Sequence, residues 1–317
     1  MGTFLLKRIM QSAILLILVT VIAFGMMRLA PGGPEALYAV GGNMKAEDLA
    51  RLRKSFGLDE PVHIQYVKWT TGMLTGDWGR SYRDRRPVTA VIFERIPATL
   101  ELTVSALLIA IIVGVTIGVL GAIRQYSVAD YAATVGAMLA LSIPTFWFGL
   151  MVIYLFAVRL GWIPSGGRQT LGEPFSLVDR LHHLAAPALV LGLVLVATWS
   201  RYTRAAMLEV IGQDFVRVAR AKGLSESRVL FTHALRNALV PLVTLAGIQL
   251  PLLFGGALVT ESVFTWPGMG RLMVDSLSYR DYPVMMGILF ITAVLVIIFN
   301  LISDFLSAML DPRIRLI

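Results

Sequence analysis

The sequence predicts an all-α, polytopic membrane protein with six transmembrane helices. Of its 317 residues, 56% are hydrophobic and only 15% are charged, whereas a soluble domain averages about 45–50% apolar and about 25% charged residues. The apolar residues are concentrated in runs of about 20, which is the length that crosses a bilayer as a helix. The net charge of +8 lies largely in short loops, which indicates a lipid bilayer rather than nucleic acid as the main partner.

The first apolar run predicts a membrane helix at about Ile9–Leu29. Lys7 and Arg8 precede it, and the run from Met10 to Met27 is uninterrupted. A cleaved signal peptide has an apolar core of about 7–15 residues and a small-residue cleavage site, neither of which fits here. We therefore expect this run to stay in the membrane.

The next segment, Pro31–Pro97, is too polar to cross a membrane and predicts a small helical extracytoplasmic segment. Glu47–Phe56 has helical spacing and Gly57 is placed to end it, and Pro61–Met73 reads as a second amphipathic helix. The sequence Gly76-Asp77-Trp78-Gly79 predicts a turn after it. Both helices have apolar faces, which we expect to pack on the outer membrane face or on a neighbour.

Five further apolar runs predict the remaining membrane helices. The fourth span is the shortest, and we expect it to continue as helix through Arg201 and Arg204. The five predicted spans are Ala98–Ile123, Ala132–Val158, Leu184–Trp199, Ala238–Val259 and Val284–Phe305.

Small residues and prolines predict how these helices pack and bend. Gly114 and Gly118 form a G-x-x-x-G pattern, extended by Gly121, which permits the close approach of two helices. Pro144 and Pro251 fall inside predicted spans and should distort them. Trp162, Trp199 and Trp266 fall near the predicted interfaces, where aromatic side chains are enriched.

The distribution of Lys and Arg predicts that both termini are cytoplasmic. The segment 31–97 is also rich in Lys and Arg, but segments of about 60 residues or more translocate largely regardless of charge. The predicted division is a cytoplasmic N-terminus with the first helix (1–30), the extracytoplasmic segment (31–97), a core (98–310) with a cytoplasmic loop at 201–236, and a cytoplasmic tail (311–317). In this topology the cytoplasmic cations are Lys7, Arg8, Arg124, Arg201, Arg204, Arg217, Arg220, Lys222, Arg228, Arg236, Arg313 and Arg315, against Arg159, Arg168, Arg180, Arg271 and Arg280 in the short outer loops.

The sequence gives no pattern for catalysis, for a metal site or for nucleotide binding by this chain. It has no cysteine, no His-Glu-x-x-His, and no glycine followed by lysine, so it lacks the P-loop pattern. His182 and His183 are adjacent, cannot share a helix face, and read as part of an interfacial loop. Glu101 and Asp304 lie near the ends of their spans, whereas an ion-driven transporter usually carries such groups near the midplane. We therefore expect no cofactor on this chain, and an energy source outside it.

The segment Arg217–Ser225 is the strongest candidate site. Gly223 can adopt the left-handed conformation that ends a helix, and Ser225 can cap the next one. Alanines keep the first helix thin and cations surround it, which suits docking of a cytoplasmic protein; an ordinary positively charged loop is the alternative. The candidate docking residues are Arg217, Ala219, Arg220, Ala221, Lys222, Gly223, Leu224 and Ser225.

Polar side chains within the apolar spans are candidates for lining a translocation pathway. Hydrogen bonds between helices are the alternative explanation for each of them. The candidates are Glu101, Ser142, Thr145, Thr198 and Gln249.

Ordered motifs along nearly the whole chain resemble the permease subunits of ABC importers of the dipeptide, oligopeptide and nickel group, of the type that precedes its paralogous partner permease. One departure is Gly33, where this group usually carries Asp. Another is Arg217-Val218-Ala219, which stands where importer permeases in general carry Glu-Ala-Ala, although the peptide and nickel branch looks like this chain. The motifs are RLAPGGP from Arg28, GLDEP from Gly57, GDWGRS from Gly76, RIPATL from Arg95, SIPTFW from Ser142, DFVRVARAKGLS from Asp214, HALRNAL from His233, TESVFTWPGMG from Thr260, RDYP from Arg280 and LDPRIR from Leu310.

The resemblance implies a type I ABC importer permease fold and a set of partners. These are a homologous second permease, two ATPase subunits that bind ATP and Mg, and an extracytoplasmic substrate-binding protein, in the cytoplasmic (inner) membrane of a bacterium or archaeon. It further implies that segment 217–225 couples this chain to the ATPases and that peptides are the cargo. Nickel, glutathione or a sugar are alternative cargoes, and a secondary transporter is a remote alternative class.

Overall fold

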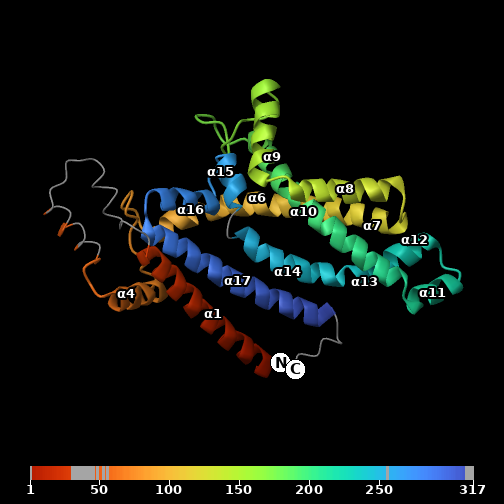
Figure 1. Cartoon of the computed structure of the whole chain (residues 1–317), viewed down its shortest axis with the longest axis horizontal. Helices are drawn as coiled ribbons and strands as arrows, with labels where there is room; N and C mark the ends of the chain where they lie inside the picture. Colours follow the sequence, from red (N-terminus) through yellow and green to blue (C-terminus); the bar gives the residue numbers. More distant parts are fainter. Residues whose placement is uncertain are drawn as a thin grey trace.

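The computed structural model describes residues 2–29, 47, 50–51, 54, 57–254 and 257–310. Within these residues the chain consists of helices joined by turns and irregular connections, and its only β pairing is an isolated antiparallel bridge between Arg80 and Pro87. Long helices run along a common direction, with α4 and α16 at one end of the molecule and α11 and α12 at the other (Figure 1). The helical elements, where η marks a π-helical turn, are α1 Gly2–Leu29, α4 Val62–Thr75, α5 Val88–Phe93, α6 Ile96–Ile109, η1 Ala110–Gly114, α7 Val115–Ile123, α8 Val128–Ser142, α9 Thr145–Val152, η2 Ile153–Arg159, α10 Leu177–Ile211, α11 Asp214–Ala221, α12 Glu226–Arg228, η3 Val229–Ala234, α13 Leu235–Ala238, α14 Val240–Phe254, α15 Leu258–Val263, α16 Met269–Ser278 and α17 Tyr282–Leu310.

The apolar helices confirm a polytopic membrane protein. Among the described residues, five helices are long and apolar enough to cross a bilayer, and a bent helix pair gives a sixth crossing if it counts as one span. The five are Leu6–Leu29, Val88–Ile123, Leu177–Ile211, Glu226–Gly247 and Tyr282–Phe305.

The third predicted span is two helices rather than one. α8 ends at Ser142, α9 begins at Thr145, and the pair is bent by 99°, so that α9 stands away from the layer of α6, α7 and α8 (Figure 1). Ile143 has extended backbone angles of φ −83° and ψ 125°, because a residue before proline is pushed out of the helical region. The predicted distortion at Pro144 is confirmed and the single helix Ala132–Val158 is wrong. α14, by contrast, continues as helix through position 251 to Phe254.

The fourth span begins earlier than predicted and continues past its apolar run as expected. α10 continues through Arg201 and Arg204 to Ile211, as expected, and begins at Leu177. His182 and His183 therefore lie in the first turns of a helix and not in a loop. The hydroxyl of Ser176 accepts a hydrogen bond from the Asp179 amide at 3.4 Å, so a polar cap starts the helix before the apolar run begins.

Close packing of α7 on α10 confirms the small-residue pattern. A Cβ atom on Gly118 would lie 2.5 Å from Cβ of Thr203 and 2.6 Å from the Ser200 carbonyl oxygen. A Cβ on Gly114 would lie 2.8 Å from Cβ of Trp199. Only glycine lets the two backbones come this near, so these positions set the distance between the helices.

A buried ion pair joins α8 to the same helix. Asp130 is only 3% exposed, and its two carboxylate oxygens accept hydrogen bonds from Arg204 at 2.6 and 2.8 Å. Two parallel hydrogen bonds between a guanidinium and a carboxylate form a bidentate ion pair, which is stronger than a single hydrogen bond. The pair fixes α8 to α10 where α10 approaches α11.

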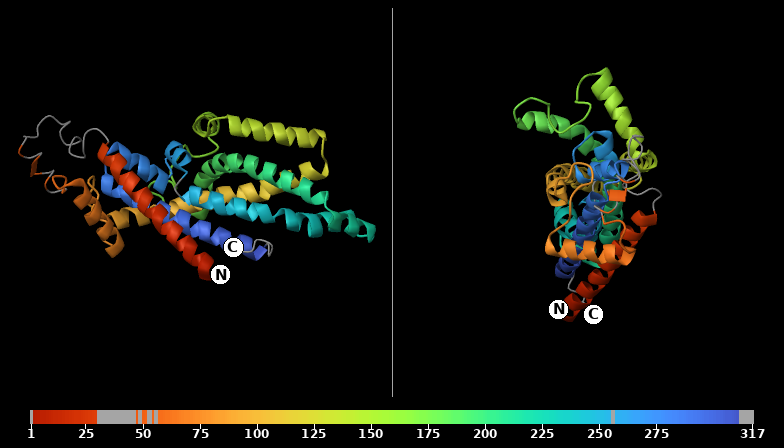
Figure 2. Two further views of the ribbon diagram at one scale, coloured as in Figure 1. Left: turned by 60° about the horizontal axis from the view of Figure 1, so that its bottom comes forward. Right: turned by 90° about the vertical axis from the view of Figure 1, so that its left-hand side faces the viewer.

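α1 packs along one edge of the molecule against α17 and α4 (Figure 2). Near one end Arg8 lies 3.0 Å from Asp304. Farther along, the Thr20 and Tyr66 hydroxyls are 3.0 Å apart, and Phe24 packs on the rings of Tyr66 and Trp69. Polar contacts therefore hold both halves of an otherwise apolar helix.

The segment after α1 is helical where it is described. α4 confirms the predicted helix Pro61–Met73, and Gly76 ends it in the left-handed region with φ +88°. Gly79, at φ +73°, completes the predicted turn. The predicted helix Glu47–Phe56 lies largely outside the described residues.

Candidate coupling surface and translocation pathway

α11 and α12 form the helix, turn and helix that the sequence predicts. Gly223 has φ +76°, and its amide donates to the Arg220 carbonyl at 2.9 Å. α12 begins at Glu226 with Ser225 in the N-cap position, but the Ser225 side chain makes no cap hydrogen bond. The turn therefore rests on the conformation of Gly223 and not on the serine hydroxyl.

One face of α11 packs on the protein itself. Val216 is fully buried and Ala219 is 6% exposed; both join an apolar cluster that includes Met207 of α10 and Val229 of η3, and Leu224 packs against it. Ala219 therefore faces the protein itself, and its role in coupling stays a prediction. Ala219 is small because α11 lies close to α10 and η3.

The neighbouring face of α11 is an exposed apolar strip with a cationic rim. Phe215 is 40% and Val218 is 51% exposed, and Ala221, Arg217 and Lys222 are exposed beside them. Phe215 and Val218 were not among the predicted docking residues. The sequence did carry a signal for them, because Phe215 and Val218 are three residues apart and so share a helix face. The pair at 216 and 219 has the same spacing, which indicates a helix with two apolar faces. We call Phe215, Val218 and Ala221 the docking strip.

Arg220 is engaged within the chain. Its guanidinium donates to both carboxylate oxygens of Glu226, at 2.6 and 3.1 Å, across the turn at Gly223. Arg217 lies 3.5 Å from Asp214 on the same helix, where both side chains are well exposed. Of the predicted cationic donors, Arg220 therefore braces the turn, and Arg217 and Lys222 border the docking strip.

Glu101, the first pathway candidate, anchors the connection between η2 and α10. Arg168 donates to its Oε2 atom at 2.6 and 2.9 Å, and Arg180 Nε lies 3.4 Å from its Oε1 atom. Arg168 lies in the connection between η2 and α10, and Arg180 lies in the first turns of α10. The carboxylate thus ties that connection to α6.

The other pathway candidates have separate environments. Gln249 accepts a hydrogen bond from the Trp199 indole at 2.7 Å, which joins α14 to α10. Thr198 donates to Val194 at 3.4 Å and Ser142 to Met138 at 2.8 Å, each within its own helix, and Thr145 is partly buried. The contact of Gln249 favours helix packing, those of Thr198 and Ser142 join no second helix, and the pathway assignment stays a prediction for all of them.

A buried carboxylate in α15 was not predicted from the sequence. Glu261 of α15 is fully buried; its oxygens accept hydrogen bonds from the Thr99 hydroxyl at 2.8 Å and the Arg271 amide at 3.0 Å. A Cβ on Gly268 would lie 2.4 Å from this carboxyl group. Burial raises the pKa of Glu261, against the opposing effect of these hydrogen bonds and one from the Gly270 amide. Glu261 therefore joins α6, α15 and α16.

A second contact that was not anticipated joins the segment after α1 to the core. The Ser81 hydroxyl donates to Asp281, whose other oxygen accepts from the Tyr82 amide at 2.9 Å. Ser81 and Asp281 are 2% and 3% exposed, and the Arg83 guanidinium stacks on Tyr279 at 3.9 Å. The GDWGRS and RDYP motifs, about 200 residues apart, therefore meet.

Comparison with known proteins defines the family. A family described as "Binding-protein-dependent transport system inner membrane component" matches residues 114–316, and its N-terminal companion family matches residues 1–103. The oligopeptide transport system permease protein AppB of Bacillus subtilis is 44% identical over 99% of this chain and 100% of its own. The dipeptide transport system permease protein DppB of Escherichia coli is 38% identical over 98% of each chain.

Solved structures agree on the fold. One, titled as an inward-facing conformation of the MetNI methionine ABC transporter, has a TM-score of 0.55 at 20% identity, over 70% of this chain and 97% of that one. An amino acid ABC transporter has a TM-score of 0.51 at 17% identity, over 71% and 95%. The fold is that of a type I ABC importer permease, a multi-pass membrane protein. The chain belongs to the family of binding-protein-dependent transport system inner membrane components.

Proposed function

We propose that this chain is the permease subunit of an ATP-driven importer of di- and oligopeptides and forms half of its translocation pathway. The observation that carries the proposal is the similarity, from end to end, to permease proteins named for oligopeptide and dipeptide transport. The fold of ABC importer permeases supports the same class.

The proposal includes partners that complete the transporter. A homologous second permease supplies the other half of the pathway, two ATPase subunits bind and hydrolyse ATP with Mg, and an extracytoplasmic protein delivers the peptide. This chain has no catalytic role and binds no cofactor in the scheme. It lies in the cytoplasmic membrane of a bacterium or archaeon, with both termini and α11 on the cytoplasmic side.

Coupling proceeds through α11 in this proposal. The docking strip of Phe215, Val218 and Ala221 sits in a groove of an ATPase subunit, with Arg217 and Lys222 at its rim. Val216 and Ala219 hold the neighbouring face of α11 against α10 and η3, so that movement of α11 moves α10. α10 is one helix of 35 residues, about 52 Å long at about 1.5 Å per residue, which is enough to carry that movement to the outer face.

Peptide uptake by cells that carry the whole transporter tests the proposal. Labelled tri-alanine should accumulate only when the binding protein and both ATPases are present, and accumulation should stop when ATP is depleted while the proton gradient is kept. Uptake that continues without ATP would indicate a secondary transporter. ATP-dependent uptake of labelled nickel, glutathione or a sugar, with no uptake of tri-alanine, would assign one of those cargoes instead.

A further inference from the structure

α4 contacts α1 before the apolar span of α1 ends. The span is Leu6–Leu29. The Thr20 hydroxyl lies 3.0 Å from the hydroxyl of Tyr66, and the Phe24 ring packs on the ring of Trp69. At about 1.5 Å per residue, Thr20 and Phe24 lie about 21 Å and about 27 Å along α1 from the start of the span. The hydrocarbon core of a bilayer is about 30 Å thick, so α4 meets α1 at the depth of the acyl chains, close to one face of the membrane.

α4 lies across α1 and does not run beside it (Figure 2). It has 14 residues, and Gly76 ends it in the left-handed region. A helix needs about 20 residues to cross a bilayer, so α4 is too short to be a span. A short helix that crosses a membrane span at this depth lies near the plane of the membrane.

One face of α4 is an exposed apolar stripe. Ile64, Val67 and Leu74 share this face, because residues three and seven apart lie on the same side of a helix. Their exposed fractions are 38%, 59% and 77%. Gln65 and Met73, on the opposite face, are buried. We call Ile64, Val67 and Leu74 the α4 stripe.

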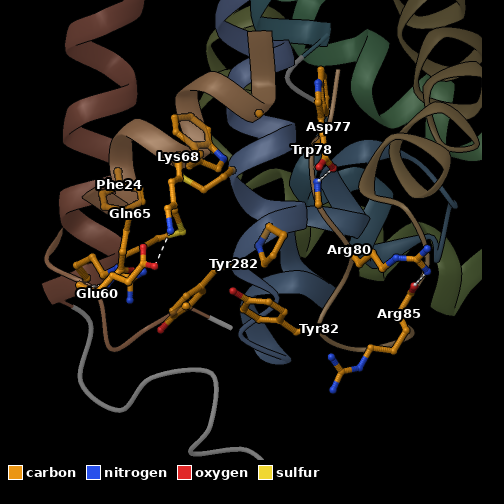
Figure 3. A pocket seen from close by; sticks show the side chains of 18 residues that line it. Phe24, Glu60, Gln65, Lys68, Asp77, Trp78, Arg80, Tyr82, Arg85 and Tyr282 are labelled. Carbon is orange, nitrogen blue, oxygen red and sulfur yellow. Dashed lines mark hydrogen bonds and ion pairs between the residues drawn. The ribbon is translucent and has the colours of Figure 1, made fainter. Parts of the chain in front are cut away.

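The opposite face of α4 borders the body of the protein. A cavity of about 500 Å³ lies between α4, the end of α1, the connection at 77–85 and the start of α17. Figure 3 shows Lys68 of α4 on one side of this cavity and Trp78 and Tyr82 on the other. In the described part of the chain, the cavity wall does not include the α4 stripe, which therefore points away from the body of the protein.

The hydroxyl groups beside the stripe are satisfied within α4 itself. Thr70 donates to the Tyr66 carbonyl at 2.9 Å. Thr71 donates to the Val67 carbonyl at 2.8 Å, and Thr75 donates to the Thr71 carbonyl at 3.0 Å. Hydrocarbon offers no hydrogen-bond partners, so polar groups that face it must be paired within the protein. These threonines therefore suit a face in contact with lipid.

The size of the stripe favours lipid over a second protein as its occupant. A stable protein interface takes about 20–30 residues from each partner, whereas the stripe consists of a few apolar side chains. The neighbouring helix α1 lies at an edge of the molecule (Figure 2) and also exposes apolar side chains, with Ile14 64% and Ile17 61% exposed. The stripe therefore continues a surface of the kind that lipid covers.

We propose that α4 is an interfacial helix whose stripe is immersed in one leaflet of the bilayer. The apolar face of such a helix lies about 5–10 Å deep, at the boundary between headgroups and acyl chains. Tyr66 and Trp69 attach α4 to α1 at that depth. The inference rests on the proposed function only for the choice of leaflet, which is the outer one when the N-terminus is cytoplasmic.

Spin labels on the whole transporter, in vesicles of phosphatidylethanolamine and phosphatidylglycerol, test the proposal. The chain has no cysteine, so Val67→Cys or Leu74→Cys carries a single nitroxide when the partner subunits are made without cysteine. Oxygen concentrates among the acyl chains and a nickel chelate in water, so their collision rates with the label report its depth. We expect both labels at a depth of about 5–10 Å, with oxygen collisions more frequent than collisions with the nickel chelate.

Two further positions calibrate the measurement. Ile17→Cys lies within the span of α1 and reports acyl chains, and Gln213→Cys, exposed between α10 and α11, reports water. The labels on α4 should resemble that of Ile17→Cys. Collisions with the nickel chelate as frequent as in Gln213→Cys would overturn the inference. Labels that neither reagent reaches would also overturn it, because a second permease would then cover the stripe.

Uptake of tri-alanine and chemical labelling separate this inference from the proposed function. Labels in water, with normal uptake by the same variants, refute the inference and leave the proposed function standing. Labels among the acyl chains support the inference even when wild type imports no peptide, a result that refutes the proposed function. Asp77→Cys, exposed just after α4, should react with a membrane-impermeant maleimide on intact cells. Reaction only after lysis would place α4 in the inner leaflet and overturn the assignment to the outer one.

Discussion

At the scale of single residues, backbone conformation and buried hydrogen bonds decide which positions are sensitive to change. The need for glycine at 223 could be predicted because a polar turn between two helical patterns is a local signal. Glu261 could not be predicted, since its partner Thr99 is 162 residues away and no local pattern marks a buried acid. Trp199 and Trp266, expected at the membrane interface, are 3% and 0% exposed, because each indole finds a hydrogen-bond acceptor inside, on Gln249 and Ala98.

Replacement of Gly223 by aspartate should uncouple transport. No atom lies within 4 Å of a Cβ at this position, so the side chain fits, and the cost is the left-handed backbone, about 1–2 kcal/mol for a residue other than glycine. We expect uptake to fall at least about tenfold, because the turn relaxes and moves the docking strip (a change of about 1.4 kcal/mol is tenfold in an equilibrium). Membrane insertion should be normal, and Gly223→Asn, which tolerates this backbone better, should retain more uptake. Normal uptake by Gly223→Asp would contradict the coupling role.

Glu261 should give stability a pH dependence. Because burial raises the pKa of its carboxyl above the ordinary value of 4.5, the folded state binds the proton more tightly than the unfolded state, so the contribution is fully present below pH 4.5 and is lost as pH rises through the raised pKa. Glu261→Gln leaves a backbone amide short of an acceptor, a cost of about 1–3 kcal/mol. The melting temperature of wild type should exceed that of Glu261→Gln by an amount that shrinks from about pH 5 to about pH 8. An advantage that grows with pH would show that the ionised carboxylate is favoured.

At the scale of elements, the length of the apolar runs predicted where the membrane helices lie. Their ends differ from the prediction where a capping residue or a proline begins or breaks a helix. α10 begins seven residues before the predicted Leu184, at Leu177, because a capping serine lies in a polar stretch that hydropathy alone assigns to a loop. The break at Pro144 could be predicted but its 99° angle could not, since the angle depends on how Gly149 of α9 packs against Val263 and Phe264.

Two glycines in the membrane helices should respond differently to alanine. Gly118→Ala forces α7 away from α10 at the contact with Thr203, and overpacking of this kind costs about 1–3 kcal/mol. No atom lies within 4 Å of a Cβ placed on Gly136 of α8, so Gly136→Ala should be neutral or slightly stabilising, because alanine favours the helix by about 1 kcal/mol. Thermal unfolding in detergent measures both, and equal melting temperatures would contradict the close packing of these helices.

At the scale of the whole molecule, the sequence identified the class of protein but not the contacts between distant segments. The ordered motifs predicted the permease fold, and the family match confirms it. That GDWGRS and RDYP meet through Ser81 and Asp281 could not be read from either motif, because each is polar and turn-like on its own. Their contact attaches the segment after α1 to the corner between α16 and α17.

The Ser81–Asp281 contact should stabilise the end of the molecule where the segment after α1 meets α16 and α17. A double-mutant cycle with Ser81→Ala and Asp281→Asn should give a coupling energy of about 0.5–3 kcal/mol, as for buried residues in one hydrogen-bond network. Asp281→Asn should cost more than Ser81→Ala, because Asp281 also accepts from the Tyr82 amide. Ser278→Ala, whose hydroxyl bonds only within α16 in the described structure, should be nearly neutral. If the stability lost by the double variant equals the sum of the losses of the two single variants, the contact is refuted.

The unbroken length of α10 has a thermodynamic consequence for the assembled transporter. One of its ends packs near α11 through Met207, and the other carries Arg180 beside Glu101. If nucleotide bound below shifts the equilibrium position of this helix, a ligand that favours one position from above must change nucleotide affinity by the same factor. The coupling free energy between delivery of cargo and binding of ATP is then the same in both directions. The measured effect of cargo on the affinity for ATP therefore gives the effect of ATP on the affinity for cargo.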